Sequence, residues 1–184
     1  MGKTILVEFR RWVVRASNQF AELTTGVVYI HSSPAALCPH VEWALTSALE
    51  ARANLKWTAQ PASDGLLRTT TNWVGPVGTG AKIAHALRSW SMLRYEVTED
   101  PSEGVDGERF SHVPGLGLWR GQMSANGDIV VSENRLHALM ASGTEFLVNE
   151  IHNALGTAWD EALEPYRRGG EFGAEVTWLR REVV

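Results

Sequence analysis

Residues 26–31 are Gly-Val-Val-Tyr-Ile-His, a β-branched and aromatic run that predicts a buried strand. A helix is expected to begin near Pro39, because proline favours the first turn of a helix. Two alternating segments, 54–58 and 67–73, then predict two more strands. The turn-forming sequence Ser-Asp-Gly at 63–65 lies between these strands and would connect them.

A second helix and a fourth strand complete this first half of the chain. The segment 75–78 is Gly-Pro-Val-Gly, which interrupts regular structure, and Thr79 is then expected to cap a helix with an apolar stripe. Residues 93–98 alternate between apolar and polar side chains, as a half-buried strand does. The order over residues 26–98 is therefore βαββαβ, which is the ferredoxin-like order.

The rest of the chain predicts a β-hairpin, two helices and a closing strand. The hairpin spans residues 116–131 and turns through Asn-Gly, a strong turn signal. The helices begin near Ser132 and Thr144, and the closing strand covers 176–179. No internal repeat or linker divides the sequence, so we expect an α+β fold with a single domain over residues 25–184.

The composition of the 184-residue chain, with 44% hydrophobic and 21% charged residues, is typical of a globular protein. Its formal net charge of -4 argues against nucleic-acid binding. The single cysteine excludes an intrachain disulfide and fits the reducing cytoplasm. No apolar run approaches the roughly 20 residues that a membrane-spanning helix needs, so no transmembrane segment is expected.

The N-terminal segment differs in charge from the rest of the chain. Residues 1–20 carry four cations and one carboxylate, a net charge of +3, so the remaining chain carries -7. Ile5, Phe9 and Trp12 fall at helical spacing there, which is compatible with a helix that docks on a membrane surface or a partner. We favour the alternative that residues 1–24 are a loosely ordered extension.

The sequence is rich in tryptophan, with eight residues, and one of them departs from its helix pattern. Trp43 lies on the face of its predicted helix that is opposite the apolar stripe. Such a tryptophan is either an anchor in a protein interface or part of a core that a later element covers, and both alternatives stay open. The apolar stripe consists of Val41, Ala44, Leu45, Ala48 and Leu49.

The glycine-rich loop before the second helix is a candidate anion site. Its backbone N–H groups and the positive end of the helix would face a phosphate or carboxylate. The loop lacks the ending of a Walker loop and the spacing of a dinucleotide-binding loop. The alternative is a tight turn followed by a helix cap, in which the glycines are needed only for their conformation. The candidate ligand-binding residues are Gly75, Gly78, Thr79, Gly80 and Lys82.

Cys38, His31 and His40 cluster around the first strand–helix connection. A helix N-terminus favours the thiolate, so Cys38 is a candidate nucleophile with a histidine as its base. The three residues do not have a recognised zinc spacing, so no metal site is assigned. We favour the alternative that the cysteine is buried and the histidines only pack or cap, which leaves no residue assigned as catalytic.

Six carboxylates fall within residues 96–108. Their spacing is not that of a calcium loop. A basic partner could dock on them, but such a charge run is usually a solvated loop, which is what we expect.

Six separated blocks carry a resemblance to a known family. They are Gly-Val-Val-Tyr-Ile-His-Ser-Ser-Pro at 26–34, Leu-Cys-Pro-His-Val-Glu-Trp-Ala at 37–44, Gly-Pro-Val-Gly-Thr-Gly-Ala at 75–81, Arg-Tyr-Glu-Val-Thr-Glu-Asp-Pro at 94–101, Asp-Gly-Glu-Arg-Phe-Ser-His-Val-Pro at 106–114 and Trp-Asp-Glu-Ala-Leu-Glu-Pro-Tyr-Arg at 159–167. The chain resembles, from about residue 26 to 181, an actinobacterial family known only as a domain of unknown function. The resemblance implies a cytoplasmic protein without an established activity or cofactor, and some members are encoded beside enzymes of fatty-acid synthesis.

The sequence contains no complete catalytic constellation, so it favours a non-enzymatic accessory or regulatory protein. We expect it to bind a protein partner, a small anionic ligand or both, and the resemblance adds a link to fatty-acid or acyl-CoA metabolism. The alternative is an enzyme that uses Cys38 with His31 or His40, and holds an anionic substrate in the loop from Gly75 to Lys82. Whether the protein forms a homo-oligomer stays open.

Overall fold

The computed structural model describes residues 22–141 and 146–168, which form one antiparallel seven-stranded sheet with five α-helices. This confirms the predicted α+β class. The elements are β1 (Leu23–Pro34), the 3₁₀ turn η1 (Ala35–Leu37), α2 (Cys38–Leu49), β2 (Thr58–Ala59), β3 (Leu66–Pro76), α3 (Thr79–Leu87), β4 (Arg94–Glu99), β5 (Gly107–Val113), β6 (Gly117–Met123), β7 (Ile129–Val130), α4 (Glu133–Ala141), α5 (Leu147–Leu155) and α6 (Thr157–Arg168).

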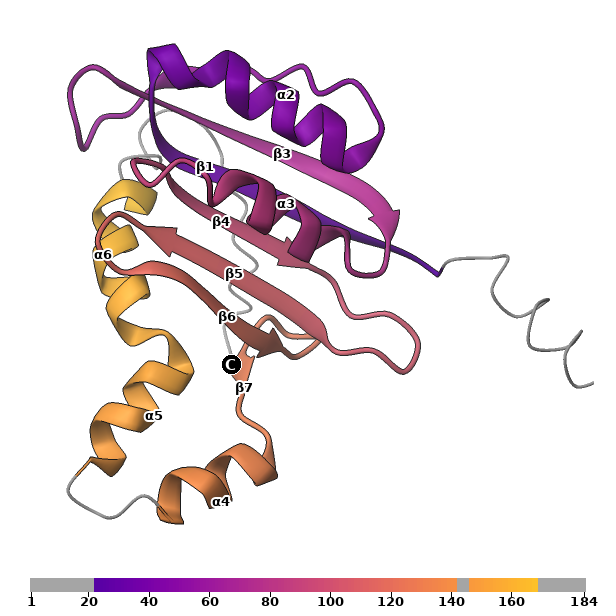
Figure 1. Ribbon diagram of the computed structural model, residues 1–184, viewed down its shortest axis with the longest axis vertical. Coiled ribbons are helices and arrows are strands. Elements are labelled where there is room, and N and C mark those ends of the chain that lie inside the picture. The colour runs from indigo at the N-terminus through magenta and orange to yellow at the C-terminus, as the bar shows by residue number, and fades with distance from the viewer. Residues whose placement is uncertain (1–21, 142–145, 169–184) are drawn as a thin grey trace, which may run out of the picture.

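Strand β1 lies between β3 and β4 (Figure 1). The strand order is β2-β3-β1-β4-β5-β6-β7, and all neighbouring strands are antiparallel. Along the chain the first elements follow the order β1, α2, β2, β3, α3, β4, with η1 between β1 and α2. Successive side chains of β1 alternate between the two faces of the sheet. Because β1 is paired on both sides, each of these side chains has neighbours from β3 and β4 on its own face.

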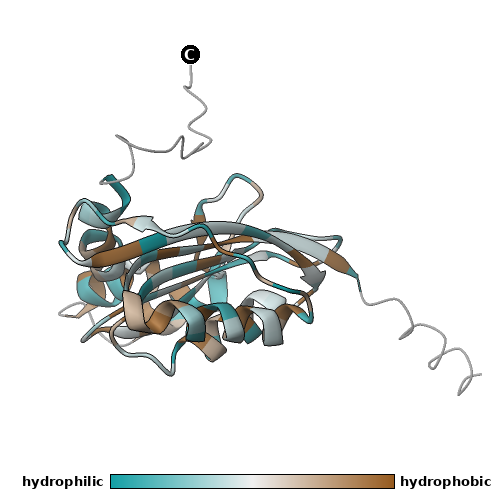
Figure 2. Cartoon of the chain, turned by 90° about the horizontal axis from the view of Figure 1, so that it is seen from above, coloured by the Kyte–Doolittle hydropathy of each residue, from teal (hydrophilic) through white to brown (hydrophobic). Residues whose placement is uncertain are grey.

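Helices α2 and α3 cover one face of the sheet and form the hydrophobic core with it (Figures 1 and 2). Val28 and Ile30 of β1 point toward this face and are buried. The apolar stripes predicted for both helices are confirmed, and each fully buried Val, Leu or Ile contributes about 1.5–3 kcal/mol. The buried residues of the two helices include Val41, Ala44, Leu45, Ile83 and Leu87.

The strand predicted over residues 54–58 is wrong over most of its length, since β2 contains only Thr58 and Ala59. Upstream of β2, Leu55 is buried, and the indole N–H of Trp57 donates to the carboxylate of Glu42 in α2 at 2.8 Å. Packing against α2 therefore takes the place of strand pairing in this segment. An alternating pattern is compatible with either arrangement.

Two elements of the structure have no counterpart in the sequence prediction, and both contribute to the site described below. Strand β5 begins inside the acidic run, and α6 contains Pro165 within its last turn. Helix α6 packs at one end of the strands, on the face opposite α2 and α3 (Figure 1).

Some predictions fall outside the described residues, namely those for residues 1–21, the helix start at Thr144 and the strand at 176–179. Strand β1 includes Leu23 and Thr24, the last two residues of the predicted extension. The predicted hairpin is confirmed as β6 and β7. Of the helices in residues 22–141 and 146–168, none is both long and apolar enough to cross a membrane.

Candidate functional site

A row of polar side chains crosses the sheet on the face opposite α2 and α3. Strand pairing sets Tyr29 of β1 opposite Glu96 of β4, and Glu96 opposite Ser111 of β5. Directly paired residues point to the same face, so these three side chains lie side by side. His31 follows in a bulge where the register of β1 shifts, and its ring stacks on Tyr29 with the centroids 6.0 Å apart.

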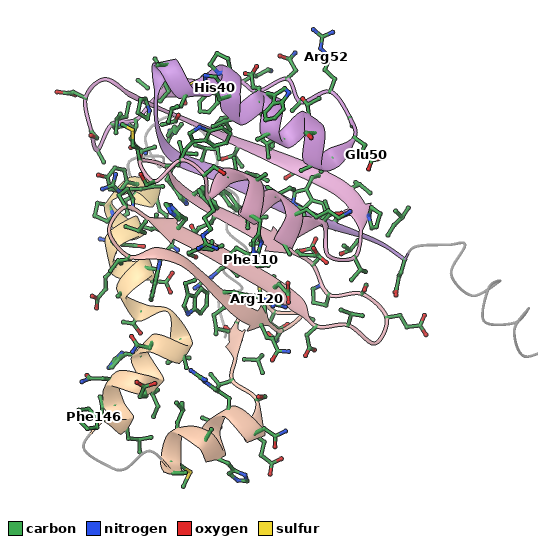
Figure 3. All side chains as sticks on the ribbon, viewed as in Figure 1. His40, Glu50, Arg52, Phe110, Arg120 and Phe146 are labelled. Atoms are coloured by element: carbon green, nitrogen blue, oxygen red, sulfur yellow. The ribbon has the colours of Figure 1, made fainter. Side chains whose placement is uncertain are left out.

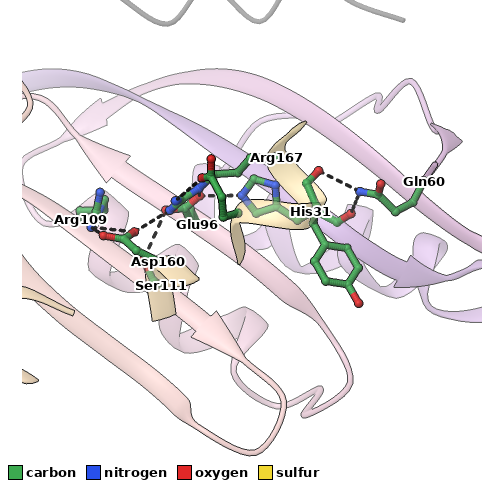
Figure 4. A network of polar contacts seen from close by, with 9 residues as sticks. His31, Gln60, Glu96, Arg109, Ser111, Asp160 and Arg167 are labelled. Atoms are coloured by element: carbon green, nitrogen blue, oxygen red, sulfur yellow. Dashed lines mark hydrogen bonds and ion pairs between the residues drawn. The ribbon is translucent and has the colours of Figure 1, made fainter. Parts of the chain in front are cut away.

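Glu96 is the centre of a buried polar network (Figure 4). The Nε2 atom of His31 lies 2.6 Å from the Oε2 atom of Glu96. Arg167 donates from Nε to the same oxygen at 2.9 Å and from Nη2 to Oε1. The Ser111 hydroxyl lies 3.5 Å from Oε1. The carboxylate, which is 2% exposed, thus has protein partners on both oxygens.

Helix α6 supplies Arg167 together with Asp160, which lies seven residues earlier and therefore two turns away on the same helix face. Asp160 accepts a hydrogen bond from Arg167 at 2.7 Å and two from Arg109 of β5 at 3.0 and 3.1 Å. Leu163, between them on the same face, is fully buried. The network therefore fastens α6 to β4 and β5.

Electrostatics keep Glu96 ionised in this buried position. Burial alone would raise the pKa of Glu96, but the hydrogen bonds from His31 and Arg167 and the charge of Arg167 lower it, and the net shift is downward. An ionised carboxylate only accepts hydrogen bonds. The ring of His31 must therefore donate from Nε2, which fixes the position of one ring proton.

A pocket of about 290 Å³ opens beside this network. It lies over β1, β2 and β3 at the end of α6. Among the described residues that line it, none is an aspartate or a glutamate. The polar and aromatic lining includes Tyr29, His31, Lys56, Arg68, Tyr166 and Arg167.

The three cations of the pocket differ in how their charge is compensated. Arg167 is paired with Glu96 and Asp160. Lys56 and Arg68 form no ion pair with any residue in 22–141 or 146–168. Two cations without an acidic partner among the described residues therefore line this pocket, in a chain whose net charge is -4.

Gln60, which is 2% exposed, connects two of the residues that line the pocket. Its amide donates to the backbone carbonyl of His31 at 2.6 Å and to that of Tyr166 at 3.2 Å. The ring of Tyr166 is held in turn by Arg94, whose guanidinium lies 4.4 Å from the ring centroid. These contacts give β1 and α6 a fixed relative position.

The predicted anion loop, Gly75 to Lys82, binds a carboxylate from another part of the same chain. The amides of Gly78 and Gly80 each donate to the carboxylate of Glu99, at 2.7 Å. The prediction of Thr79 as the N-cap is wrong by one residue, since Gly78 caps α3 with a φ of 88°. That conformation favours glycine. Binding of an external anion in this loop stays a prediction, and it requires that Glu99 be displaced.

The structure separates Cys38, His31 and His40. The Sγ atom of Cys38 lies 3.7 Å from the carbonyl oxygen of Pro34, and burial raises the pKa of this thiol. His31 is bonded to Glu96, and His40 is exposed on α2 with its ring 6.3 Å from that of Trp90 (Figure 3). The described residues contain no cluster of three or more potential metal ligands. This geometry gives no support to a cysteine nucleophile.

Trp43 is 70% exposed on the outer face of α2. A groove of about 350 Å³ lies beside it, between α2 and α3, and Trp90 and Lys82 also line this groove. No described element covers the indole of Trp43. An interface role for this residue stays a proposal.

The expectation that residues 96–108 are a solvated loop is wrong for the carboxylates of β4. Glu96 and Glu99 are 2% and 4% exposed. The strict alternation over 93–98 is a signal that places Glu96 in a strand, whereas Glu99 lies one residue beyond that segment. For Arg167 the only local signal is its spacing of seven residues from Asp160.

Fold and site together define an α+β protein in which a single antiparallel sheet carries a buried ionic network and a cationic pocket on one face. The chain belongs to the family described as "Protein of unknown function (DUF3145)", whose model matches residues 27–181. Comparisons with curated proteins and with solved structures give no match.

Proposed function

We propose that the protein binds a small anionic ligand in the pocket beside His31. The observation that carries this proposal is the convergence of Lys56 and Arg68 on a pocket. Among the described residues, neither cation has an ion-pair partner and no acidic side chain lines the pocket. A phosphate or carboxylate would compensate both charges. Uncompensated cations in a partly enclosed pocket attract anions more strongly than exposed ones, because the effective dielectric constant is lower there.

The surroundings of the pocket support binding. Gln60 and the network at Glu96 hold β1 and α6 in place, so the lining residues need little reorganisation when a ligand enters. A volume of about 290 Å³ limits the ligand to a small molecule. We therefore propose a binding or regulatory role for this protein.

Titration with inorganic phosphate, followed by NMR or calorimetry, tests this proposal. The wild-type protein is expected to bind phosphate, and Lys56→Met or Arg68→Met is expected to weaken binding about tenfold, since each removes a charge-assisted hydrogen bond. Arg88→Gln, at an exposed cation outside the pocket, serves as the matched control and should bind as the wild type does.

Lys82→Met separates the pocket from the loop that the sequence predicts as an anion site. If this variant alone loses phosphate binding, the loop and not the pocket is the site. A wild-type protein that binds no phosphate would contradict the proposal altogether.

A second candidate function is docking of an acidic protein segment on the groove between α2 and α3, with Trp43 as the anchor. Its support is the exposure of Trp43 together with the charge of α3, whose exposed side includes Lys82, His85 and Arg88. No acidic residue occurs between residues 79 and 90. An acidic segment with an apolar side chain would match both the charge and the indole.

Affinity capture with the immobilised protein tests this docking surface. Proteins bound through the groove are expected to be lost from Trp43→Ala and from Lys82→Glu, and retained by Arg52→Gln, a control at an exposed cation outside the groove. If the captured proteins are the same for all four, the groove is not a docking site.

We further propose that residues 23–99 are a ferredoxin-like unit, and the strand order β4-β1-β3-β2 together with the chain order supports this. A cytoplasmic location is supported by the single cysteine. The actinobacterial origin and the link to fatty-acid or acyl-CoA metabolism rest on the sequence resemblance alone.

A further inference from the structure

His31 gives the pocket a hydrogen-bond acceptor that can be deduced from its contacts. Its Nε2 atom lies 2.6 Å from a carboxylate oxygen of Glu96, which also accepts a hydrogen bond from Arg167. Three donors, from His31, Arg167 and Ser111, surround this buried carboxylate, so it accepts and does not donate. When the ring of His31 is neutral, its proton is therefore on Nε2, and Nδ1 then has a free lone pair.

Within the described residues, Nδ1 of His31 has no hydrogen-bond partner. It lies on the side of the ring away from Glu96, and His31 lines the pocket (Figure 4). The cationic groups of the lining, on Lys56, Arg68 and Arg167, can only donate. The pocket thus combines donors for an anion with one imidazole nitrogen that accepts.

We propose that the ligand is a small hydroxylated anion, such as a phosphorylated polyol or a hydroxy acid. Its anionic group binds Lys56 and Arg68, and a hydroxyl group donates a hydrogen bond to Nδ1 of His31. This inference rests on the proposed anion pocket and adds the chemical class of the ligand. His31 acts as a specificity-determining residue, because a ligand without a hydroxyl leaves this acceptor unpaired.

Two matched phosphate esters test the hydroxyl contact. Glycerol 3-phosphate and propyl phosphate carry the same phosphate and carbon chain and differ in the hydroxyl groups. The wild-type protein is expected to bind glycerol 3-phosphate about tenfold more tightly, as one hydrogen bond of this kind provides. If both esters bind equally well and both depend on Lys56, the hydroxyl inference fails while the anion pocket stands. If neither ester nor inorganic phosphate binds, the anion pocket itself is wrong.

His31→Gln isolates the acceptor. The glutamine amide N–H can donate to Glu96 in place of Nε2–H, so the network keeps its bond. The glutamine carbonyl oxygen does not occupy the position of Nδ1, because it lies three bonds from Cβ, whereas Nδ1 lies two bonds from Cβ. We expect this variant to bind propyl phosphate as the wild type does and to lose the preference for glycerol 3-phosphate. A retained preference in the folded variant would overturn the role of His31.

The protonation of the ring can be measured on the wild-type protein without any variant. Long-range ¹H–¹⁵N NMR spectra distinguish a protonated ring nitrogen from one with a free lone pair. For His31 the neutral ring is expected to carry the proton on Nε2, and glycerol 3-phosphate is expected to shift the Nδ1 signal. A neutral ring protonated on Nδ1, or an Nδ1 signal that the ester leaves unchanged while it binds, would overturn the inference.

Discussion

Replacing Arg167 by methionine is expected to lower the free energy of unfolding by about 3–5 kcal/mol, the usual cost of removing one partner of a buried ion pair. Methionine keeps much of the volume of the side chain, but of its partners in the described residues Glu96 then retains only His31 and Ser111. A carboxylate that is 2% exposed cannot recover the lost hydrogen bonds from water. Helix α6 also loses its link to β4, so local unfolding of the variant should begin at this helix.

Urea denaturation followed by tryptophan fluorescence measures this effect, and the adjacent arginine provides the control. Arg168 pairs with Glu164 on the surface, where its side chain is 72% exposed. Exposed pairs of this kind contribute little, so Arg168→Met should change the stability by less than about 1 kcal/mol. Equal losses in the two variants would show that Arg167 acts through helix propensity and not through Glu96.

The difference between Arg167→Met and the wild type should also depend on pH. In the folded protein the pKa of Glu96 lies below its ordinary value of 4.5, so the contribution of this group is fully present above that value and is lost as the pH falls through the folded pKa. Without Arg167 the pKa of Glu96 is lowered less. The stability difference between the two proteins should therefore shrink on acidification below about pH 4.

How much of the fold and of the site can be predicted from the sequence depends on how far apart the interacting residues lie along the chain. Helices α2 and α3 follow from the local spacing of apolar residues such as Val41 and Ile83, and this spacing needs no knowledge of distant contacts. The polar network is different, because its members lie 65 residues apart for His31 and Glu96, and 71 for Glu96 and Arg167. No local pattern indicates which buried histidine meets which carboxylate.

The glycine loop shows the same limit within a candidate site. Its sequence correctly indicates free amide groups that suit an anion, and in the structure those amides bind a carboxylate. Nothing local shows that the carboxylate comes from Glu99, about twenty residues further along the chain. Only the pairing of β1 with β4 brings Glu99 to the start of α3.

Glu99→Ala is expected to lower the free energy of unfolding by about 3–6 kcal/mol, because it removes two charge-assisted hydrogen bonds of about 1.5–3 kcal/mol each. Both bonds, from the amides of Gly78 and Gly80, are 2.7 Å long, and the Glu99 side chain that accepts them is buried. The variant leaves two unpaired N–H groups at the positive end of α3. Glu103→Gln, at an exposed carboxylate nearby, is the matched control and should be close to neutral.

The same variant decides whether the loop can hold an external anion. Acetate presents the carboxylate that Glu99→Ala has lost, and the removed side chain leaves space for it beside Gly80. If the loop is an anion site in its own right, acetate should raise the melting temperature of Glu99→Ala and not that of the wild-type protein, in which Glu99 already fills the site. Chloride at the same ionic strength controls for screening. An equal response of both proteins to acetate would mean that the amides serve only Glu99 and that the loop is a structural cap.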